Sequence, residues 1–289
     1  MYNKTTKDCK RVFRFVKLLS YIKKVFNKFY ILLGIRKSVA DDGSYPKFCE
    51  LASENDEVFQ TFRRHPSYTK ILEHVSDDLG IKYYKNIKNE FGLTDKEIFS
   101  YCEKIHDVGS PYLVNLITDL PPISTTALRY LSTGLQINSI LESKNIEKII
   151  EIGAGYGGQA VILDSLLNIK EYTFVDLREV NLLIKKFLSK SDVGFIPQFN
   201  SLEDSFNKQY DLVISNFAFS ELSRTLQNIA MNKIIKKSNK GFMIINSHNF
   251  NEAYNFYTKE ELLSELPNSI FLPEVPNSSL KGENYLLTF

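Results

Sequence analysis

The chain has 289 residues, of which 43% are hydrophobic and 24% are charged, and its formal net charge is +2. These values are typical of a globular protein with one large or two modest domains, and they exclude a disordered chain. Residues 1–40 contain eleven Lys and Arg against one acid, Asp8, so the remaining residues carry a net charge of −8. An acidic body of this kind argues against nucleic acid as a partner.

Three cysteines, Cys9, Cys49 and Cys102, lie far apart and outside any metal-ligand spacing. We expect free thiols in a reducing compartment. No run reaches the ~20 apolar residues of a membrane span. Lys and Arg continue through the apolar part of the N-terminus, which is not the order of a signal peptide. The sequence therefore predicts a cytoplasmic protein.

Residues 10–35 predict a basic amphipathic helix, because apolar residues recur there at helical spacing with Lys and Arg on the other faces. One interpretation is an anchor that lies in the plane of an anionic membrane surface, at the inner face of the membrane. The other is a helix that packs on the body of the protein or on a second subunit of a homo-oligomer. We treat residues 1–40 as a separate basic segment.

Residues 41–140 are predicted to form a helical N-terminal region that caps a ligand site or mediates oligomer contacts. Ser124 is placed to cap a helix over residues 125–140. This helix would bring Arg129 and Tyr130 towards the glycine-rich stretch that follows in the sequence. Arg129 is then either a surface helix residue or a group that binds a carboxylate or a phosphate through a forked pair of hydrogen bonds.

From residue 146 onward strands and helices alternate, which indicates a parallel sheet with crossover helices. Strands are expected at residues 148–152, 171–176, 193–198, 210–215, 241–246, 269–272 and 285–289. Helices are expected at residues 158–167, 180–189, 223–237 and 259–266. We assign residues 141–289 to one ligand-binding catalytic domain of the α/β class.

Four closely spaced glycines follow the first of these strands, in Ile149-Ile-Glu-Ile-Gly-Ala-Gly-Tyr-Gly-Gly-Gln-Ala160. Glycine adopts positive φ at little cost and lets the backbone approach a ligand without an intervening Cβ. Gly153, Gly155 and Gly157 therefore predict a turn that wraps a small molecule. The helix that follows adds free N–H groups at its first turn.

Two ligand classes use such a turn. Gly153, Gly155 and Gly158 satisfy G-x-G-x-x-G, in which a helix N-terminus faces the pyrophosphate of a dinucleotide. Glu151 together with Gly153, Gly155 and Gly157 satisfies E-x-G-x-G-x-G instead. A carboxylate repels a pyrophosphate at short range but suits a ligand that carries an ammonium and a sulfonium. The second pattern resembles the first motif of class I S-adenosylmethionine-dependent methyltransferases, and we favour that methyl donor as the cofactor.

Ligands on such sheets bind beyond the carboxyl ends of the strands, so we look for contacts there. Asp176 closes the second strand about twenty residues past the turn, where an acid accepts hydrogen bonds from ribose hydroxyls. It can instead cap the helix that follows. The methyltransferase resemblance implies that Leu202 and Glu203, after the third strand, lie near the adenine ring, although an ordinary loop fits them equally. Asn216, after the fourth strand, is a candidate contact for donor or acceptor.

The run Ser215-Asn-Phe-Ala-Phe-Ser-Glu221 interleaves aromatic and polar residues where the donor methyl and an acceptor would meet. Phe217, Arg129 and Tyr130 are therefore candidates for acceptor contacts. A hydroxyl acceptor must lose its proton as the oxygen attacks the methyl group. His248, after the fifth strand, suits that role because histidine titrates near neutrality. Glu221 is the second candidate base.

Three stretches together are similar to the sugar O-methyltransferase family of bacteria. They are Arg129-Tyr130, Glu151-Ile-Gly-Ala-Gly-Tyr-Gly-Gly-Gln159 and Ser215-Asn-Phe-Ala-Phe-Ser-Glu-Leu222. The resemblance covers about residues 105–289, although family members have Gly-Asn-Pro where this chain has Gly109-Ser110-Pro111. It implies a Rossmann-like, seven-stranded class I methyltransferase sheet with a helical N-terminal region. It also implies methyl transfer from S-adenosylmethionine to a sugar hydroxyl, in surface polysaccharide or glycolipid synthesis.

Two other interpretations stay open. A nicotinamide-dependent oxidoreductase acting on sugar nucleotides would share the glycine turn and Asp176, but no Tyr-x-x-x-Lys pair follows the fourth strand. A non-catalytic protein that has kept the methyltransferase fold is the second. No compact set of Asp, Glu and His compels a metal ion, so no metal site is assigned.

Overall fold

A computed structural model describes residues 38, 43–116, 119–140, 145–246, 255–279 and 282–289. The predicted basic helix at residues 10–35, Cys9 and the candidate base His248 lie outside the described residues. Among the described residues, Cys49 and Cys102 are buried and carry free thiols. Within the described part of the chain, no helix is long and apolar enough to cross a membrane.

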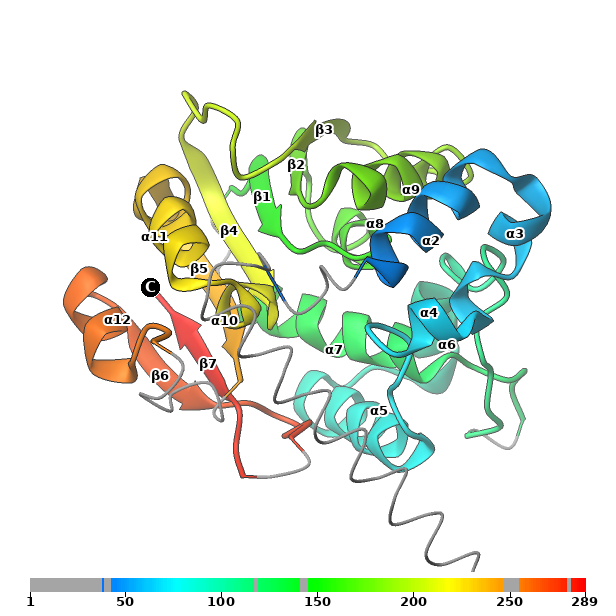
Figure 1. Cartoon of the computed structure of the whole chain (residues 1–289). Helices are drawn as coiled ribbons and strands as arrows, with labels where there is room; N and C mark the ends of the chain where they lie inside the picture. The colour runs from blue at the N-terminus through cyan, green and yellow to red at the C-terminus, as the bar shows by residue number, and fades with distance from the viewer. Residues whose placement is uncertain (1–37, 39–42, 117–118, 141–144, 247–254, 280–281) are drawn as a thin grey trace, which may run out of the picture.

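A seven-stranded sheet with the strand order β3-β2-β1-β4-β5-β7-β6 forms the centre of the molecule (Figure 1). Strands β1 to β5 are parallel, and β7 runs antiparallel to both β5 and β6. The strands are β1 (Lys148–Ile152), β2 (Glu171–Val175), β3 (Ile196–Asn200), β4 (Tyr210–Asn216), β5 (Ser238–Ile245), β6 (Ile270–Pro273) and β7 (Tyr285–Thr288). The sequence therefore predicted the number and sequence order of the strands correctly.

Apolar side chains of the central strands alternate between the two faces of the sheet, as the period of a strand requires. In β1, Ile149 belongs to one buried cluster and Ile150 to the other. The first face is covered by α7 (Thr125–Ile140), α8 (Gly158–Asp164) and α9 (Arg178–Leu188). The second is covered by α10 (Ala218–Glu221), α11 (Arg224–Lys233), the 3-10 turn η2 (Ile235–Lys237) and α12 (Lys259–Glu265) (Figure 1).

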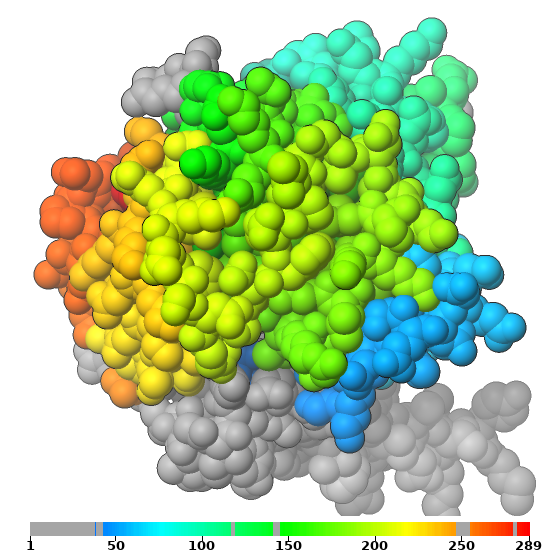
Figure 2. Space-filling model, turned by 90° about the horizontal axis from the view of Figure 1, so that it is seen from above, coloured from blue at the N-terminus to red at the C-terminus, as the bar shows by residue number. Residues whose placement is uncertain are grey.

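The region before the sheet is helical, as predicted. It contains α2 (Ser44–Glu54), α3 (Asp56–Gln60), η1 (Phe62–Arg64), α4 (Pro66–Thr69), α5 (Asp77–Phe91) and α6 (Asp95–Glu103). Helix α2 packs against α9, and Figure 2 shows these blue and yellow-green segments in contact. Ser124 caps α7, because its Oγ accepts a hydrogen bond from the N–H of Ala127 at 3.3 Å. The helical region and the first face of the sheet share one buried core.

Some element boundaries differ from the prediction. Strand β3 begins at Ile196 and not at residue 193, because its pairing with β2 sets Ile196 opposite Glu171. Pro197 is tolerated there because β3 lies at the edge of the sheet. The helix predicted over residues 223–237 is interrupted at Ile234, whose φ of −124° is not helical, and it continues as the 3-10 turn η2.

Candidate functional site

The strand order reverses between β1 and β4, so the connections from these two neighbouring strands leave the sheet in opposite directions. In open α/β sheets this position creates a crevice at the carboxyl ends of the strands. The glycine turn follows β1, and the run that contains Asn216 and Glu221 follows β4. The fold therefore brings both predicted site segments to the carboxyl edge of the sheet, at the strand-end position where such a crevice is expected, which we call the crevice below.

Three glycines of the turn have positive φ, namely Gly153 (78°), Gly155 (63°) and Gly157 (89°). A Cβ on Gly153 would lie 2.1 Å from the Cβ of Ala218 at the start of α10. A Cβ on Gly155 would lie 2.8 Å from Cδ1 of Leu72 in the helical region. The positive φ angles agree with the predicted glycine turn, and side chains of the protein lie close to its backbone on two sides.

Glu151 is buried in β1 with 2% of its surface exposed, and the Tyr172 hydroxyl donates a hydrogen bond of 2.7 Å to its Oε2. Burial raises the pKa of Glu151 to about 8; the hydrogen bond from Tyr172 lowers it, and the charge of Asp176 adds to the increase. The ion pairs of the described residues do not include Glu151. A ligand that carries positive charge would stabilise its ionised form.

Asp176 follows β2, and its carboxylate lies at the glycine turn. Its Oδ1 accepts a hydrogen bond of 2.8 Å from the N–H of Leu177. The backbone N–H groups of Gly155 and Ala154 lie near this carboxylate and favour its ionised form. Burial raises the pKa of Asp176 to about 7, although these backbone donors oppose the increase. The carboxylate is therefore fixed at the turn, where hydroxyl donors of a ligand would favour its ionised form.

The end of β4 holds two unusual features side by side. Asn216 has a buried Oδ1 without a hydrogen-bond partner among the described residues. Phe217 has a φ of 72°, a strained value for a residue with a side chain, and its N–H donates to the carbonyl of Ile244 at 2.9 Å. Glu221 lies one short helix further on and accepts a hydrogen bond of 2.9 Å from Nδ2 of Asn246. Strain and an unsatisfied polar atom are typical of functional positions.

Helix α7 brings Tyr130 to the glycine turn, and Arg129 lies beside Tyr130. The Tyr130 ring lies 5.9 Å from the ring of Tyr156, which belongs to the turn. Nε2 of Gln159, in α8, donates to the Tyr130 carbonyl at 3.1 Å. The half-buried Arg129 guanidinium lies 5.2 Å above the Tyr130 ring, and the ion pairs of the described residues do not include it. Among the described residues, the contact that Arg129 makes through its charge is therefore with the Tyr130 side chain.

Leu202 and Glu203 lie in the turn after β3. Lys233 of α11 donates from Nζ to the carbonyl oxygens of both residues, at 3.2 Å each. The Leu202 side chain packs on the core of the second face, whereas Glu203 is exposed. Their predicted contact with an adenine ring stays a prediction.

The sequence did not indicate three neighbours of the crevice. Leu72 lies against Gly155. Burial, and to a lesser degree the charge of Asp176, raises the pKa of Tyr45 and of Cys49 in α2, so both residues lie near that acid. All three come from the helical region, and Tyr45 and Cys49 precede the glycine turn by more than a hundred residues in the sequence. No local sequence pattern distinguishes them from ordinary core residues.

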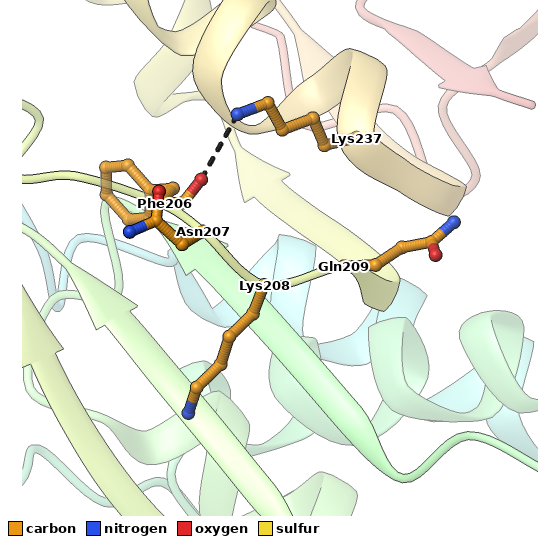
Figure 3. A pocket seen from close by; sticks show the side chains of 5 residues that line it. All are labelled: Phe206, Asn207, Lys208, Gln209 and Lys237. Carbon is orange, nitrogen blue, oxygen red and sulfur yellow. Dashed lines mark hydrogen bonds between the residues drawn. The ribbon is translucent and has the colours of Figure 1, made fainter.

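The surface also has a hollow of about 420 Å³ elsewhere, lined by Phe206, Asn207, Lys208, Gln209 and Lys237 (Figure 3). Nζ of Lys237 donates to the Phe206 carbonyl across it at 3.1 Å. The hollow lies before β4 and β5, at the amino ends of the strands, so it is on the opposite edge of the sheet from the crevice. In the described parts of the chain, no three His, Cys, Asp or Glu residues are grouped to hold a metal ion.

The strand order, with β7 antiparallel between β5 and β6, is that of the Rossmann-like sheet of class I methyltransferases. No protein-family model matches the chain. Among curated proteins it is similar to the protein-L-isoaspartate O-methyltransferase of Christiangramia forsetii, with 34% identity over 94 residues. The match covers 31% of this chain and 43% of the relative, so it spans less than half of that protein.

Several solved methyltransferase structures are also similar. The methyltransferase domain of bacterial CtHen1 is 16% identical and covers 56% of this chain and 98% of its own, with a TM-score of 0.43. The glycopeptide N-methyltransferase MtfA, solved with sinefungin, is 10% identical and covers 55% of this chain and 85% of its own, with a TM-score of 0.43. N-methyltransferase NodS of Bradyrhizobium japonicum is 12% identical and covers 56% of this chain and 93% of its own, with a TM-score of 0.42.

Proposed function

We propose that this protein transfers a methyl group from S-adenosylmethionine to a sugar hydroxyl, in the synthesis of a surface polysaccharide or glycolipid. The observation that carries the proposal is a pair of buried acids, Glu151 and Asp176, near a turn in which three glycines have positive φ. Two carboxylates beside a bare backbone suit a nucleoside with attached cations. A dinucleotide would place its pyrophosphate against Glu151.

The residues of the crevice fit the methyl donor in distinct ways. Asp176 would accept hydrogen bonds from the ribose hydroxyls, and Glu151 would offset the positive charge of the donor. Arg129 would pair with the donor carboxylate or with an anionic group of the acceptor. The unsatisfied Oδ1 of Asn216 would accept a hydrogen bond from the donor amine or the acceptor hydroxyl. When bound, the donor supplies a sulfonium-activated methyl group, and the crevice holds the acceptor in line with it.

The choice of an oxygen acceptor rests on the sequence resemblance, and the curated relative is likewise an O-methyltransferase by name. Tyr130 and Phe217 would form the apolar wall of the sugar site. Glu221 and His248 remain the candidates for the base that takes the hydroxyl proton. Replacing the true base by Gln should lower turnover by on the order of 100-fold or more while donor affinity is kept.

Isothermal titration with S-adenosylhomocysteine and with NAD tests the cofactor. We expect saturable binding of S-adenosylhomocysteine and none of NAD; the reverse result would favour the oxidoreductase. Mass spectrometry of surface glycans from cells with and without the gene then tests the acceptor, because a methylated sugar gains the mass of one methylene group. Donor binding without any methylated product across many sugars would favour a non-catalytic protein.

A further inference from the structure

Arg63 is the largest buried charged side chain of the helical region. It is 1% exposed, and its Nε and Nη1 have hydrogen-bond acceptors, whereas its buried Nη2 has none among the described residues. Its Nε donates to Oε1 of Glu73 at 2.6 Å, and its Nη1 donates to the Ile105 carbonyl at 2.6 Å and, less closely, to the Val108 carbonyl at 3.4 Å. The Glu73 side chain is 4% exposed. Removal of either partner of a buried ion pair leaves an uncompensated buried charge, so the positions of Arg63 and Glu73 depend on each other.

The same guanidinium reaches the glycine turn. Its central carbon lies 4.6 Å from the centroid of the Tyr156 ring, and Tyr156 lies between Gly155 and Gly157. The Tyr156 ring is fully buried and also packs on Phe187 of α9, with 4.8 Å between the ring centroids. Stacking of Arg on an aromatic face is attractive, more so when water is excluded. Arg63 therefore contacts the middle of the turn that would hold the donor.

Glu73, the partner of Arg63, is also connected to the turn, because the preceding residue, Leu72, contacts it. Glu73 has a φ of 54°, which is uncommon outside glycine and is kept only when contacts hold it. Leu72, the preceding residue, lies against Gly155. The ion pair is thus connected to the turn in two ways. Arg63 contacts the Tyr156 ring, and Leu72, the neighbour of Glu73, contacts Gly155.

We propose that Arg63 is a positioning residue for the methyl donor: its ion pair with Glu73 holds Tyr156 and Leu72 so that the glycine turn keeps its binding shape. The proposal rests on the proposed function. Arg63 does not touch the donor in this scheme. Its loss should weaken donor binding by disordering the turn, and saturating donor should restore most of the turnover number.

The test compares Arg63→Met with Arg64→Met. Arg64 is a matched control because it lies next in η1 and also binds carbonyls, those of Ser110 at 2.7 Å and Pro111 at 3.2 Å, but it is exposed and away from the turn. We expect Arg63→Met to weaken S-adenosylhomocysteine about tenfold or more, since roughly 1.4 kcal/mol corresponds to tenfold. Arg64→Met should stay within about twofold of wild type, on the same scale.

Hydrogen exchange of the free protein separates this proposal from the proposed function. Peptides that cover residues 149–160 should exchange faster in Arg63→Met and not in Arg64→Met, whether or not the protein binds a methyl donor. If Arg63→Met does not fold, Arg63→Lys replaces it, because lysine keeps the charge but loses the planar stack and the fork. Equal donor affinity and equal exchange at the turn in the Arg63 and Arg64 variants would overturn the proposal. A wild-type protein that ignores S-adenosylhomocysteine would instead overturn the proposed function.

Discussion

Glu151 and Asp176 share an unusual property, since both are acids held at one turn with their pKa values raised by burial, to about 8 and about 7. A raised acid pKa means that the folded protein binds protons more tightly than the unfolded chain. In the free protein, the raised pKa values favour the protonated, uncharged forms of Glu151 and Asp176 near pH 7. A bound cation would lower these pKa values and favour the ionised carboxylates.

The first prediction concerns the pH dependence of stability. The folded state of Glu151 holds its proton up to about pH 8, whereas the unfolded chain releases it near pH 4.5, so its contribution is lost as pH rises through this window. We expect the free energy of unfolding in urea to fall as pH rises from about 5 to 9, and Glu151→Gln to flatten this slope.

The control for this prediction is Glu147→Gln. The pKa of Glu147 is lowered, first by its hydrogen bond with Lys170, so its titration is complete at more acidic pH. Its substitution should leave the slope above pH 6 unchanged. An equal slope in wild type and Glu151→Gln would show that the buried acid is not the cause.

The second prediction concerns Asp176. Asp176→Ala should weaken S-adenosylhomocysteine by roughly 10- to 150-fold, because hydrogen bonds to a charged group contribute about 1.5–3 kcal/mol. Titration calorimetry measures the loss. Asp211→Ala is the control, since Oδ2 of Asp211 also accepts backbone N–H groups, from Glu147 at 3.0 Å and Lys148 at 2.9 Å, but at the amino end of the sheet. Similar losses in both variants would argue against a ribose contact.

The sequence singled out Glu151 by its spacing to the glycines, and Asp176 because it closes an apolar strand. It did not predict Arg63, Glu73 or Leu72, whose positions depend on how the helical region docks on the turn. Arg63 resembles its neighbour Arg64 in every local respect, yet one is buried against Tyr156 and the other is exposed. Long-range packing separates them, and sequence patterns do not encode it directly.

At the scale of elements, the strands were the easiest features to predict, because buried parallel strands appear as short apolar runs between helices. Four of the seven, β1, β2, β4 and β7, begin where the pattern placed them. Strand β3 was misplaced because Gly194 and Pro197 weaken its pattern, and its pairing with β2 decided the register. Strand β5 begins earlier, at Ser238, because Tyr210 pairs with it there.

The third prediction concerns the junction between β4 and α10. Phe217→Gly should be more stable than Phe217→Ala by about 1 kcal/mol, because both lose the ring but only glycine relieves the positive φ. Urea unfolding at one pH measures the difference. Equal stability of the two variants would mean that the backbone relaxes when the ring is removed.

At the scale of the whole molecule, the basic segment at residues 1–40 gives the fourth prediction. If it anchors the protein on a membrane, the full chain should co-sediment with vesicles that contain anionic lipid, and a variant without residues 1–40 should not. Added salt should weaken this binding, because surface charge is screened. Equal sedimentation of the two proteins would favour the alternative, in which the segment packs on the body or on a second subunit.

One buried core runs from Tyr45 in α2 through Tyr156 in the glycine turn to Leu286 in β7, across the boundary expected near residue 140. Because the helical region and the sheet share one continuous core, we expect them to unfold together. Scanning calorimetry should therefore record one endotherm whose van't Hoff and calorimetric enthalpies agree. Residues 141–289 expressed alone would leave the apolar sides of α8 and α9 uncovered. Such a fragment should aggregate, and the crevice should therefore exist only in a protein that retains its helical region.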